Sequence, residues 1–193
     1  MSDSSQKIVT PTAEGIAAAA TKASKTKGFP PVHLWSPPFC GDLDMRIARD
    51  GTWFYLGAPI GRKRLVKLFS TIIRKDGEDY FLITPVEKVG ITVDDAPFVA
   101  VDFDVVDNVV QFTTNVGDTV AAGPDHPIRV VLNPDGGEPS PYVLVRTNLE
   151  ALIDRKSFYR LVEQGEASTV DGIEWFGVWS KGVFFPFIKV SDL

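Results

Sequence analysis

An alternating run of charged residues offers the clearest arrangement of reactive side chains. Asp42, Asp44 and Arg46 are spaced two apart in a predicted strand, so their side chains share one face. Two carboxylates on one face could bind a metal ion or act as a general acid and base. Ordinary Asp–Arg pairing at the surface explains the same residues, and we favour it. An alternative function is a hydrolase-type enzyme that uses Asp42, Asp44 and Glu87 as its acid and base groups. His33 is a more distant fourth candidate.

A cluster of cations follows a glycine-flanked turn at residues 57–64, GAPIGRKR. Arg62 and Arg64 would lie at the N-terminus of a predicted helix, where free backbone N–H groups and guanidinium groups suit a phosphate or a carboxylate. The spacing is not that of a P-loop, and a tight strand-to-helix turn with solvated charges is the simpler interpretation. In a ligand site here, Lys88 would supply a further cation and Trp53 an apolar wall.

The remaining reactive side chains form no recognised catalytic or metal-binding arrangement. The single cysteine, Cys40, excludes an internal disulfide and a thiolate cluster. His33 and His126 lack the spacing of a Ser–His–Asp site or of zinc ligands. We therefore expect no catalytic residue, no bound metal and no cofactor.

Charge is distributed unevenly along the 193 residues, whose formal net charge is −5. Residues 1–92 contain 13 Lys and Arg against 9 Asp and Glu, whereas residues 93–193 contain 7 against 16. Nucleic-acid binding through the basic first half is therefore a second alternative, disfavoured overall. No apolar segment approaches the roughly 20 residues of a membrane span, and no secretory signal is apparent, so we expect a cytoplasmic protein.

The cationic turn of residues 57–64 lies within a strand–turn–helix–hairpin unit that we predict over residues 53–91. Its helix has Gly61 as the expected N-cap, and Asp76-Gly77 is the expected turn into the returning strand. The apolar residues of the helix follow a 3.6-residue period: Leu65, Leu68, Phe69, Ile72 and Ile73.

The same pattern recurs near the C-terminus. Residues 62–69 align with residues 155–162, with Asp154 as the second N-cap, and residues 76–83 align with residues 171–178. Two matched blocks in the same order favour an internal duplication over coincidence. We therefore expect a ligand to bind where the two copies meet.

The rest of the chain is predicted to consist mainly of strands. Thr147 and Glu150 have the spacing of a capping box, which predicts a helix from Leu149. Tyr80, Trp175, Trp179 and Phe184 are expected to be packed rather than exposed. Hairpins are expected at residues 42–56 and 97–114, and further strands at residues 128–132, 142–146 and 183–190.

Two N-terminal segments should lie over the core. Residues 1–28 form an alanine-rich, flexible or loosely packed extension in which a short helix ends at Ala23. Residues 29–40, FPPVHLWSPPFC, form a proline-rich covering arm that should run extended. We expect its large apolar side chains to turn inward: Phe29, Leu34, Trp35 and Phe39.

Three motifs resemble a bacterial family of unknown function, DUF1285. They are CGDLDMRI at residues 40–47, DGTWFYLGAPIGRKRLVKLFS at residues 50–70, and TPVEKVGI at residues 84–91 with DAPFVA following. The resemblance extends from about residue 28 to the C-terminus. It implies an α+β fold with a duplicated motif and a second half that superficially resembles a pleckstrin-homology fold. It also implies a ligand-binding or signalling role, with no established activity.

The expected protein is thus α+β, with helix-on-antiparallel-sheet units at residues 29–92 and 93–193 after the extension of residues 1–28. Its leading function is non-enzymatic binding of an anionic small molecule or a protein partner, in signal transduction, at the interface of the two repeats. The candidate ligand contacts are Asp42, Asp44, Arg46, Trp53, Arg62, Arg64 and Lys88.

Overall fold

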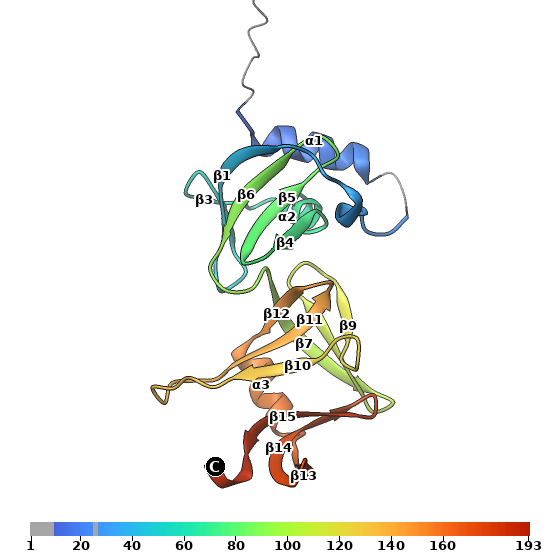
Figure 1. Ribbon diagram of the computed structural model, residues 1–193, viewed down its shortest axis with the longest axis vertical. Coiled ribbons are helices and arrows are strands. Elements are labelled where there is room, and N and C mark those ends of the chain that lie inside the picture. The colour runs from blue at the N-terminus through green and yellow to red at the C-terminus, as the bar shows by residue number, and fades with distance from the viewer. Residues whose placement is uncertain (1–9, 25–26) are drawn as a thin grey trace, which may run out of the picture. The chain divides into compact units, whose positions relative to one another are not determined.

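The computed structural model describes residues 10–24 and 27–193, and it divides into two compact units (Figure 1). The first unit takes in the described residues up to Ile47 together with Trp53–Thr92, and the second takes in Ala48–Thr52 and Val93–Leu193. Residues 1–9 and 25–26 of the predicted extension lie outside the described residues. Both units combine helices with a six-stranded sheet, which confirms the predicted α+β class.

The sheet of the first unit has the strand order β3-β2-β1-β6-β5-β4. Its centre is the contact of β1 with β6, where the Lys88 N–H donates to the Pro38 carbonyl and Gly90 lies against Asp42. Residue numbers rise together along both strands, so this pair is parallel. The strands are β1 (Phe39–Ile47), β2 (Trp53–Tyr55), β3 (Ala58–Pro59), β4 (Ile73–Asp76), β5 (Asp79–Ile83) and β6 (Lys88–Val93).

Two helices of the first unit, α1 (Ala13–Ala23) and α2 (Lys63–Ser70), pack against each other. The alanine-rich α1 buries Ile16 completely. The amphipathic α2 buries Phe69, whose ring stacks on Trp53 with centroids 6.2 Å apart. A short 3₁₀-helix, η1 (Val32–Leu34), lies in the proline-rich arm.

The second unit has a six-stranded sheet of order β10-β11-β12-β7-β8-β9 and a separate three-stranded sheet, β13-β14-β15. The pairing of β12 with β7 is parallel, so this sheet is not wholly antiparallel as predicted. Its strands are β7 (Phe98–Val106), β8 (Val109–Thr114), β9 (Thr119–Ala121), β10 (Ile128–Val131), β11 (Ser140–Arg146) and β12 (Leu149–Ile153). The helix α3 (Arg155–Val162), the strands β13 (Glu166–Val170), β14 (Ile173–Ser180) and β15 (Val183–Lys189), and η2 (Val190–Asp192) follow.

The helix α3 holds the two sheets of the second unit together. Phe158 of α3 packs on Phe187 of β15, with ring centroids 5.4 Å apart. On its other side, the Arg160 guanidinium pairs with Asp102 of β7 and donates to the Phe103 carbonyl. Because α3 is anchored at both sheets, the first turn of the helix is rigidly placed.

Strand order reveals a repeat that differs from the sequence match. Numbered from its own first strand, the β7–β12 sheet has the same order as the β1–β6 sheet, namely 3-2-1-6-5-4. The predicted helix-then-hairpin pattern is present twice, as α2-β4-β5 and α3-β13-β14. However, β4 and β5 lie within a six-stranded sheet, whereas β13 and β14 form a sheet of their own. The matched sequence blocks are therefore not topologically equivalent.

Residues 149–153 form a strand, so the helix predicted from Leu149 is wrong. They pair with β11 on one side and with β7 on the other. Leu149, Ala151 and Ile153 are buried in this position. The supposed capping residue Thr147 instead adopts a left-handed conformation (φ 50°) in the β11–β12 turn.

The predicted inward orientation of the arm's aromatic and apolar residues is also wrong. Phe29, Leu34 and Phe39 are 53%, 71% and 58% exposed, and only Trp35 is half-buried. The arm is held by its backbone instead, because Arg74 Nη1 donates to the carbonyls of Val32 (3.0 Å) and Trp35 (2.8 Å). Trp179, also expected to be packed, is 46% exposed.

The helices α2 and α3, which the sequence match aligns, begin differently, and this difference predicts a stabilising substitution. Asp154 caps α3 by accepting a hydrogen bond from the Ser157 N–H at 2.8 Å. The N-cap of α2 is Arg62, not Gly61 as predicted, and its side chain makes no capping hydrogen bond. Arg62→Asp should raise the free energy of unfolding by about 1 kcal/mol in urea denaturation, because a carboxylate both caps the helix and suits its dipole. If Arg62→Ala stabilises the protein equally, capping is not the cause.

Candidate functional site

The charged side chains of β1 lie on its exposed face, as their spacing predicts. Asp42, Asp44 and Arg46 are exposed, while the residues between them point into the core. Gly90 of β6 approaches so closely that a Cβ there would collide with the Asp42 carboxylate. Arg46 lies over the Phe54 ring, 5.4 Å from its centroid. These charged residues share one exposed face of the strand.

The remaining candidates in the first unit serve its structure or lie apart from β1. Lys88 Nζ lies 2.8 Å from Asp76 Oδ2 and 4.0 Å from the centroid of the Phe81 ring. Trp53 is only 2% exposed, so it belongs to the core and cannot form the wall of a surface site. Arg62 and Arg64 are exposed and make no ion pair with any described residue. The structure thus places Trp53 in the core and pairs Lys88 with Asp76, and a site formed by all seven contacts stays a prediction.

The acidic groups of the alternative enzyme do not converge. Glu87 is half-buried, and this burial raises the pKa of its carboxyl. It lines a groove against α1 together with Pro85 and Val86, and neither Asp42 nor Asp44 enters that groove. His33 is exposed on η1. Within residues 10–24 and 27–193, no three His, Cys, Asp or Glu side chains are placed to hold a metal ion.

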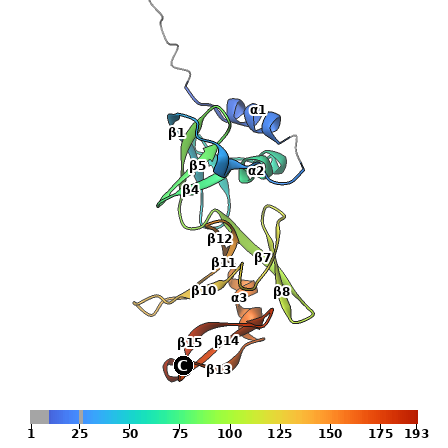
Figure 2. The same cartoon turned by 45° about the vertical axis from the view of Figure 1, so that its right-hand side comes forward.

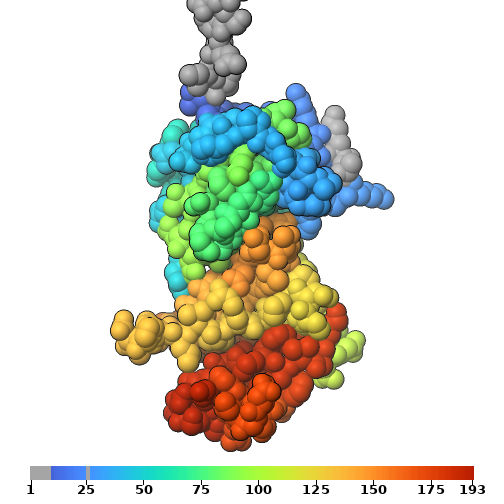
Figure 3. Space-filling model, in the orientation of Figure 1, coloured from blue at the N-terminus to red at the C-terminus, as the bar shows by residue number. Residues whose placement is uncertain are grey.

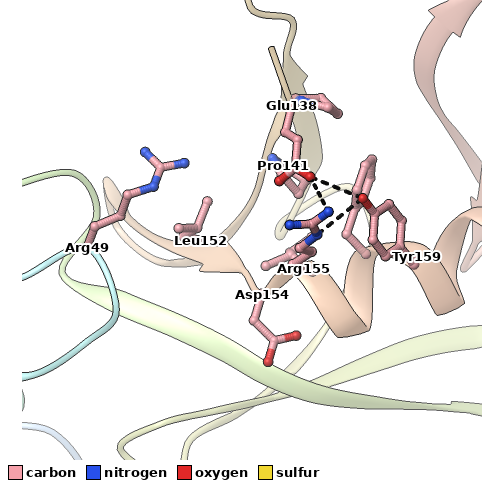
Figure 4. A pocket seen from close by; sticks show the side chains of 10 residues that line it. Arg49, Glu138, Pro141, Leu152, Asp154, Arg155 and Tyr159 are labelled. Atoms are coloured by element: carbon pink, nitrogen blue, oxygen red, sulfur yellow. Dashed lines mark hydrogen bonds and ion pairs between the residues drawn. The ribbon is translucent and has the colours of Figure 1, made fainter.

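A cavity in the second unit brings together residues that the sequence did not single out. It has a volume of about 190 Å³ and lies at the start of α3, between the β1–β2 turn and the segment that leads into β11 (Figure 4). Its apolar surface comes from Leu152 of β12, Phe158 of α3 and Pro141 of β11. Two arginines, Arg49 and Arg155, line it as well. Figure 4 shows the guanidinium group of Arg49 on one side of Leu152 and that of Arg155 on the other.

One side of this cavity already holds a carboxylate. Glu138 Oε1 lies 2.5 Å from Arg155 Nη2 and accepts a hydrogen bond of 3.3 Å from the Tyr159 hydroxyl. Arg155 Nε also donates to the Tyr159 oxygen at 3.2 Å, which closes a triangle of three polar groups (Figure 4). Glu138 comes from the segment joining β10 and β11, which projects from the surface in Figure 3. All three side chains are more than half exposed, so these contacts exchange readily with solvent.

The other arginine is held by a more buried set of groups. Arg49 Nη1 lies 2.6 Å from Asp95 Oδ2, and its Nη2 donates to Ser140 Oγ at 2.9 Å. Asp95 also accepts a hydrogen bond of 2.7 Å from the Tyr142 hydroxyl. Burial, with the Asp95 contact, raises the pKa of Tyr142. Arg49 is thus oriented by neighbours while its side chain remains 57% exposed.

The arrangement combines side chains of the kinds that suit a small anion. Two guanidinium groups flank an apolar surface, and each is already paired with a carboxylate. Asp154, at the end of the cavity, is occupied in capping α3 and points away from Glu138 in Figure 4. The sequence contained one signal for this site, because Arg155 aligns with Arg62 in the matched blocks. On that match, the sequence analysis singled out Arg62 rather than Arg155.

Fold and cavity together define an α+β protein with two sheets of the same strand order and, in its second unit, a small cavity lined by two arginines. The chain belongs to the DUF1285 family, as its three motifs predicted. The DUF1285 N-terminal domain, a domain of unknown function, matches residues 30–96, and the C-terminal domain, described as a protein of unknown function, matches residues 97–187.

Two solved structures are similar to this chain. A DUF1285 family protein from Silicibacter pomeroyi DSS-3 has 58% sequence identity and a TM-score of 0.82, and the match covers 92% of this chain and 97% of that one. A DUF1285 family protein from Shewanella baltica OS155 has 30% identity and a TM-score of 0.51, covering 63% and 91% respectively. No functionally curated protein matches the chain. In the described part of the chain, no helix has the length and apolar character to cross a membrane.

Proposed function

We propose that this chain is a non-enzymatic binding protein whose second unit takes a small molecule bearing a carboxylate. The observation that carries the proposal is the Glu138 carboxylate, which Arg155 and Tyr159 hold at the edge of an apolar cavity. A ligand carboxylate would replace that of Glu138 with no change in the local balance of charge. Its apolar body would then lie against Leu152 and Phe158.

The size of the cavity favours a small ligand. Its volume of about 190 Å³ is below the roughly 300–1,000 Å³ of pockets for drug-sized molecules. The proposal differs from the sequence expectation in placing the site wholly within the second unit. Roles in signal transduction, a cytoplasmic location and the pleckstrin-homology likeness of the second half remain predictions from the resemblance and the composition.

Nucleic-acid binding has weaker support. Two cations of the first unit, Arg74 and Lys88, are engaged with Asp76. The cationic turn at Arg62 and Arg64 is exposed, but it faces no aromatic stacking surface among the described contacts.

Benzoate, which joins a carboxylate to an apolar ring, provides the test. Titration followed by amide chemical shifts should give saturable changes at Arg155, Phe158 and Tyr159. Arg155→Met should weaken binding by about tenfold or more, because a charge-assisted bidentate contact is lost. Glu138→Gln should strengthen binding, because the internal competitor for Arg155 loses its charge.

The matched control is Arg64→Met, which removes an exposed arginine of the first unit and should leave benzoate binding unchanged. Absence of saturable shifts in the wild-type protein would refute the proposal. Equal affinity of the wild-type protein and Arg155→Met would refute it as well, and would indicate nonspecific association.

A further inference from the structure

The three-stranded sheet of the second unit ends in an open edge. Its order is β13-β14-β15, so β13 has a strand neighbour on one side only, as Figure 2 shows. Among the described residues, no backbone group of Glu166–Val170 hydrogen-bonds to an element other than β14. Half of the N–H and C=O groups of such a strand point outward and can pair with an added strand. The edge carries neither proline nor lysine, two residues that commonly block this pairing.

A hollow with apolar walls lies beside the start of β13. Its volume is about 390 Å³, and it lies between the β7–β8 hairpin and the β13–β14 hairpin. Val105, Val178 and Trp179 line it, and Val105 and Trp179 are 50% and 46% exposed. Gln164 and Glu166 contribute polar groups. An exposed tryptophan beside valines is typical of a surface that another apolar side chain covers.

The charged side chains of the β13–β14 hairpin all have one sign. From Leu161 to Ser180 there is no lysine, arginine or histidine. The same stretch has four exposed carboxylates, none of which forms an ion pair with a described residue: Glu163, Glu166, Asp171 and Glu174. Adding a second acidic strand here would be unfavourable, whereas a basic strand would be attracted.

We propose that β13 is a docking edge for an extended, basic segment of another protein. The segment pairs its backbone with β13 and places an apolar side chain in the Val105–Trp179 hollow. Its lysine or arginine side chains lie opposite the carboxylates of the β13–β14 hairpin. This is strand addition, in which backbone hydrogen bonds supply affinity and the alternating side chains supply specificity. The proposal is independent of the carboxylate cavity at α3.

The probe is the peptide acetyl-Lys-Val-Lys-Val-Lys-Val-Lys-amide, titrated into the full chain and followed by amide chemical shifts. Saturable shifts are expected at Glu166–Val170 and at the Trp179 indole. The peptide with glutamate for lysine should bind at least about tenfold more weakly, and so should the lysine peptide with N-methylated valines. The first comparison tests charge, and the second tests backbone pairing.

Protein variants test the same surface from the other side. Trp179→Ala and the double change Glu166→Lys with Glu174→Lys should each weaken peptide binding by about tenfold. The control Asp135→Lys reverses an exposed charge in the β10–β11 segment and should change affinity by less than about twofold. Because the peptide comparisons use the unaltered chain, a variant that fails to fold does not prevent a decision.

Three results would overturn the proposal. One is the absence of saturable shifts with the lysine peptide, and another is equal binding of the glutamate peptide. The third is concentration-dependent self-association of the chain without peptide, with shifts at Glu166–Val170, which would assign the edge to a second copy.

Discussion

Replacing Ser180 with alanine is expected to lower the free energy of unfolding by about 2–4 kcal/mol. Ser180 is completely buried at the end of β14. Its Oγ accepts a hydrogen bond of 2.9 Å from the Val110 N–H and donates one of 2.8 Å to the Ala122 carbonyl. One hydroxyl therefore joins the C-terminal three-stranded sheet to β8 and the end of β9. Its removal leaves two buried backbone groups without this partner.

Ser157 supplies a matched control, because it is also completely buried, yet its Oγ has no hydrogen-bond partner among the residues that the structure describes. Ser157→Ala removes an unsatisfied hydroxyl from a helix and should leave stability unchanged or raise it by up to about 1 kcal/mol. Urea denaturation followed by tryptophan fluorescence measures both variants. Equal losses in the two variants would show that loss of volume, rather than hydrogen bonding, controls stability at Ser180.

Arg74→Met is the second substitution with a large expected effect, a loss of about 2–3 kcal/mol together with release of the proline-rich arm. The Arg74 guanidinium makes two hydrogen bonds of 2.9 Å to the Asp76 carboxylate. It also holds the Val32 and Trp35 carbonyls. No other side chain in the described part of the chain makes the same combination of contacts to the arm, so faster hydrogen exchange and proteolysis should appear within residues 29–38. Arg64→Met, at an exposed arginine without ion pairs, should do neither.

The stability difference between wild type and Arg74→Met should depend on pH. The hydrogen bond from Arg74 lowers the pKa of Asp76 below its ordinary value, with further help from Lys88. A carboxyl whose pKa is lower in the folded state stabilises the protein above its unfolded pKa, and this contribution is lost as pH falls through the folded pKa. The difference should therefore be complete at neutral pH and shrink in acid below the ordinary aspartate range. A constant difference down to acidic pH would assign the effect to the carbonyl contacts alone.

Local turn chemistry made several elements predictable from the sequence. Asp107 and Asn108 both adopt positive φ, 52° and 60°, which favours the tight β7–β8 turn that their residue types indicated. The alternating pattern of residues 42–47 likewise placed charged side chains on one face of β1. In both cases the information lies within a few adjacent residues.

The errors arose where distant parts of the chain decide the outcome. Residues 149–153, LEALI, have high helix propensity, but burial between β11 and β7 favours a strand. The arm was expected to be held by its aromatic side chains, yet a single arginine, 42 residues after Val32 and 39 after Trp35, binds its backbone. Hydrophobic pattern alone cannot indicate such an anchor.

The candidate site was missed for the same reason. Its polar groups, Arg49, Glu138 and Arg155, come from three separate segments, and only strand pairing brings these segments together. The residues that the sequence favoured were close together along the chain, and the fold places Trp53 in the core and Lys88 beside Asp76. Proximity in sequence did not indicate which side chains the fold brings together.

The shared strand order has a kinetic consequence. In each six-stranded sheet the central contact joins the first strand to the last, as at Pro38 with Lys88 and at Phe98 with Ala151, about 50 residues apart. In each sheet, two three-stranded meanders can form early. Their inner edges stay exposed until all six strands have left the ribosome and the two meanders can pair. Such non-local closure slows folding and lengthens the time during which unpaired strands are open to misassembly. We therefore expect synthesis that stops within either sheet to yield aggregation-prone chains, whereas a chain ending between the sheets can complete the first one.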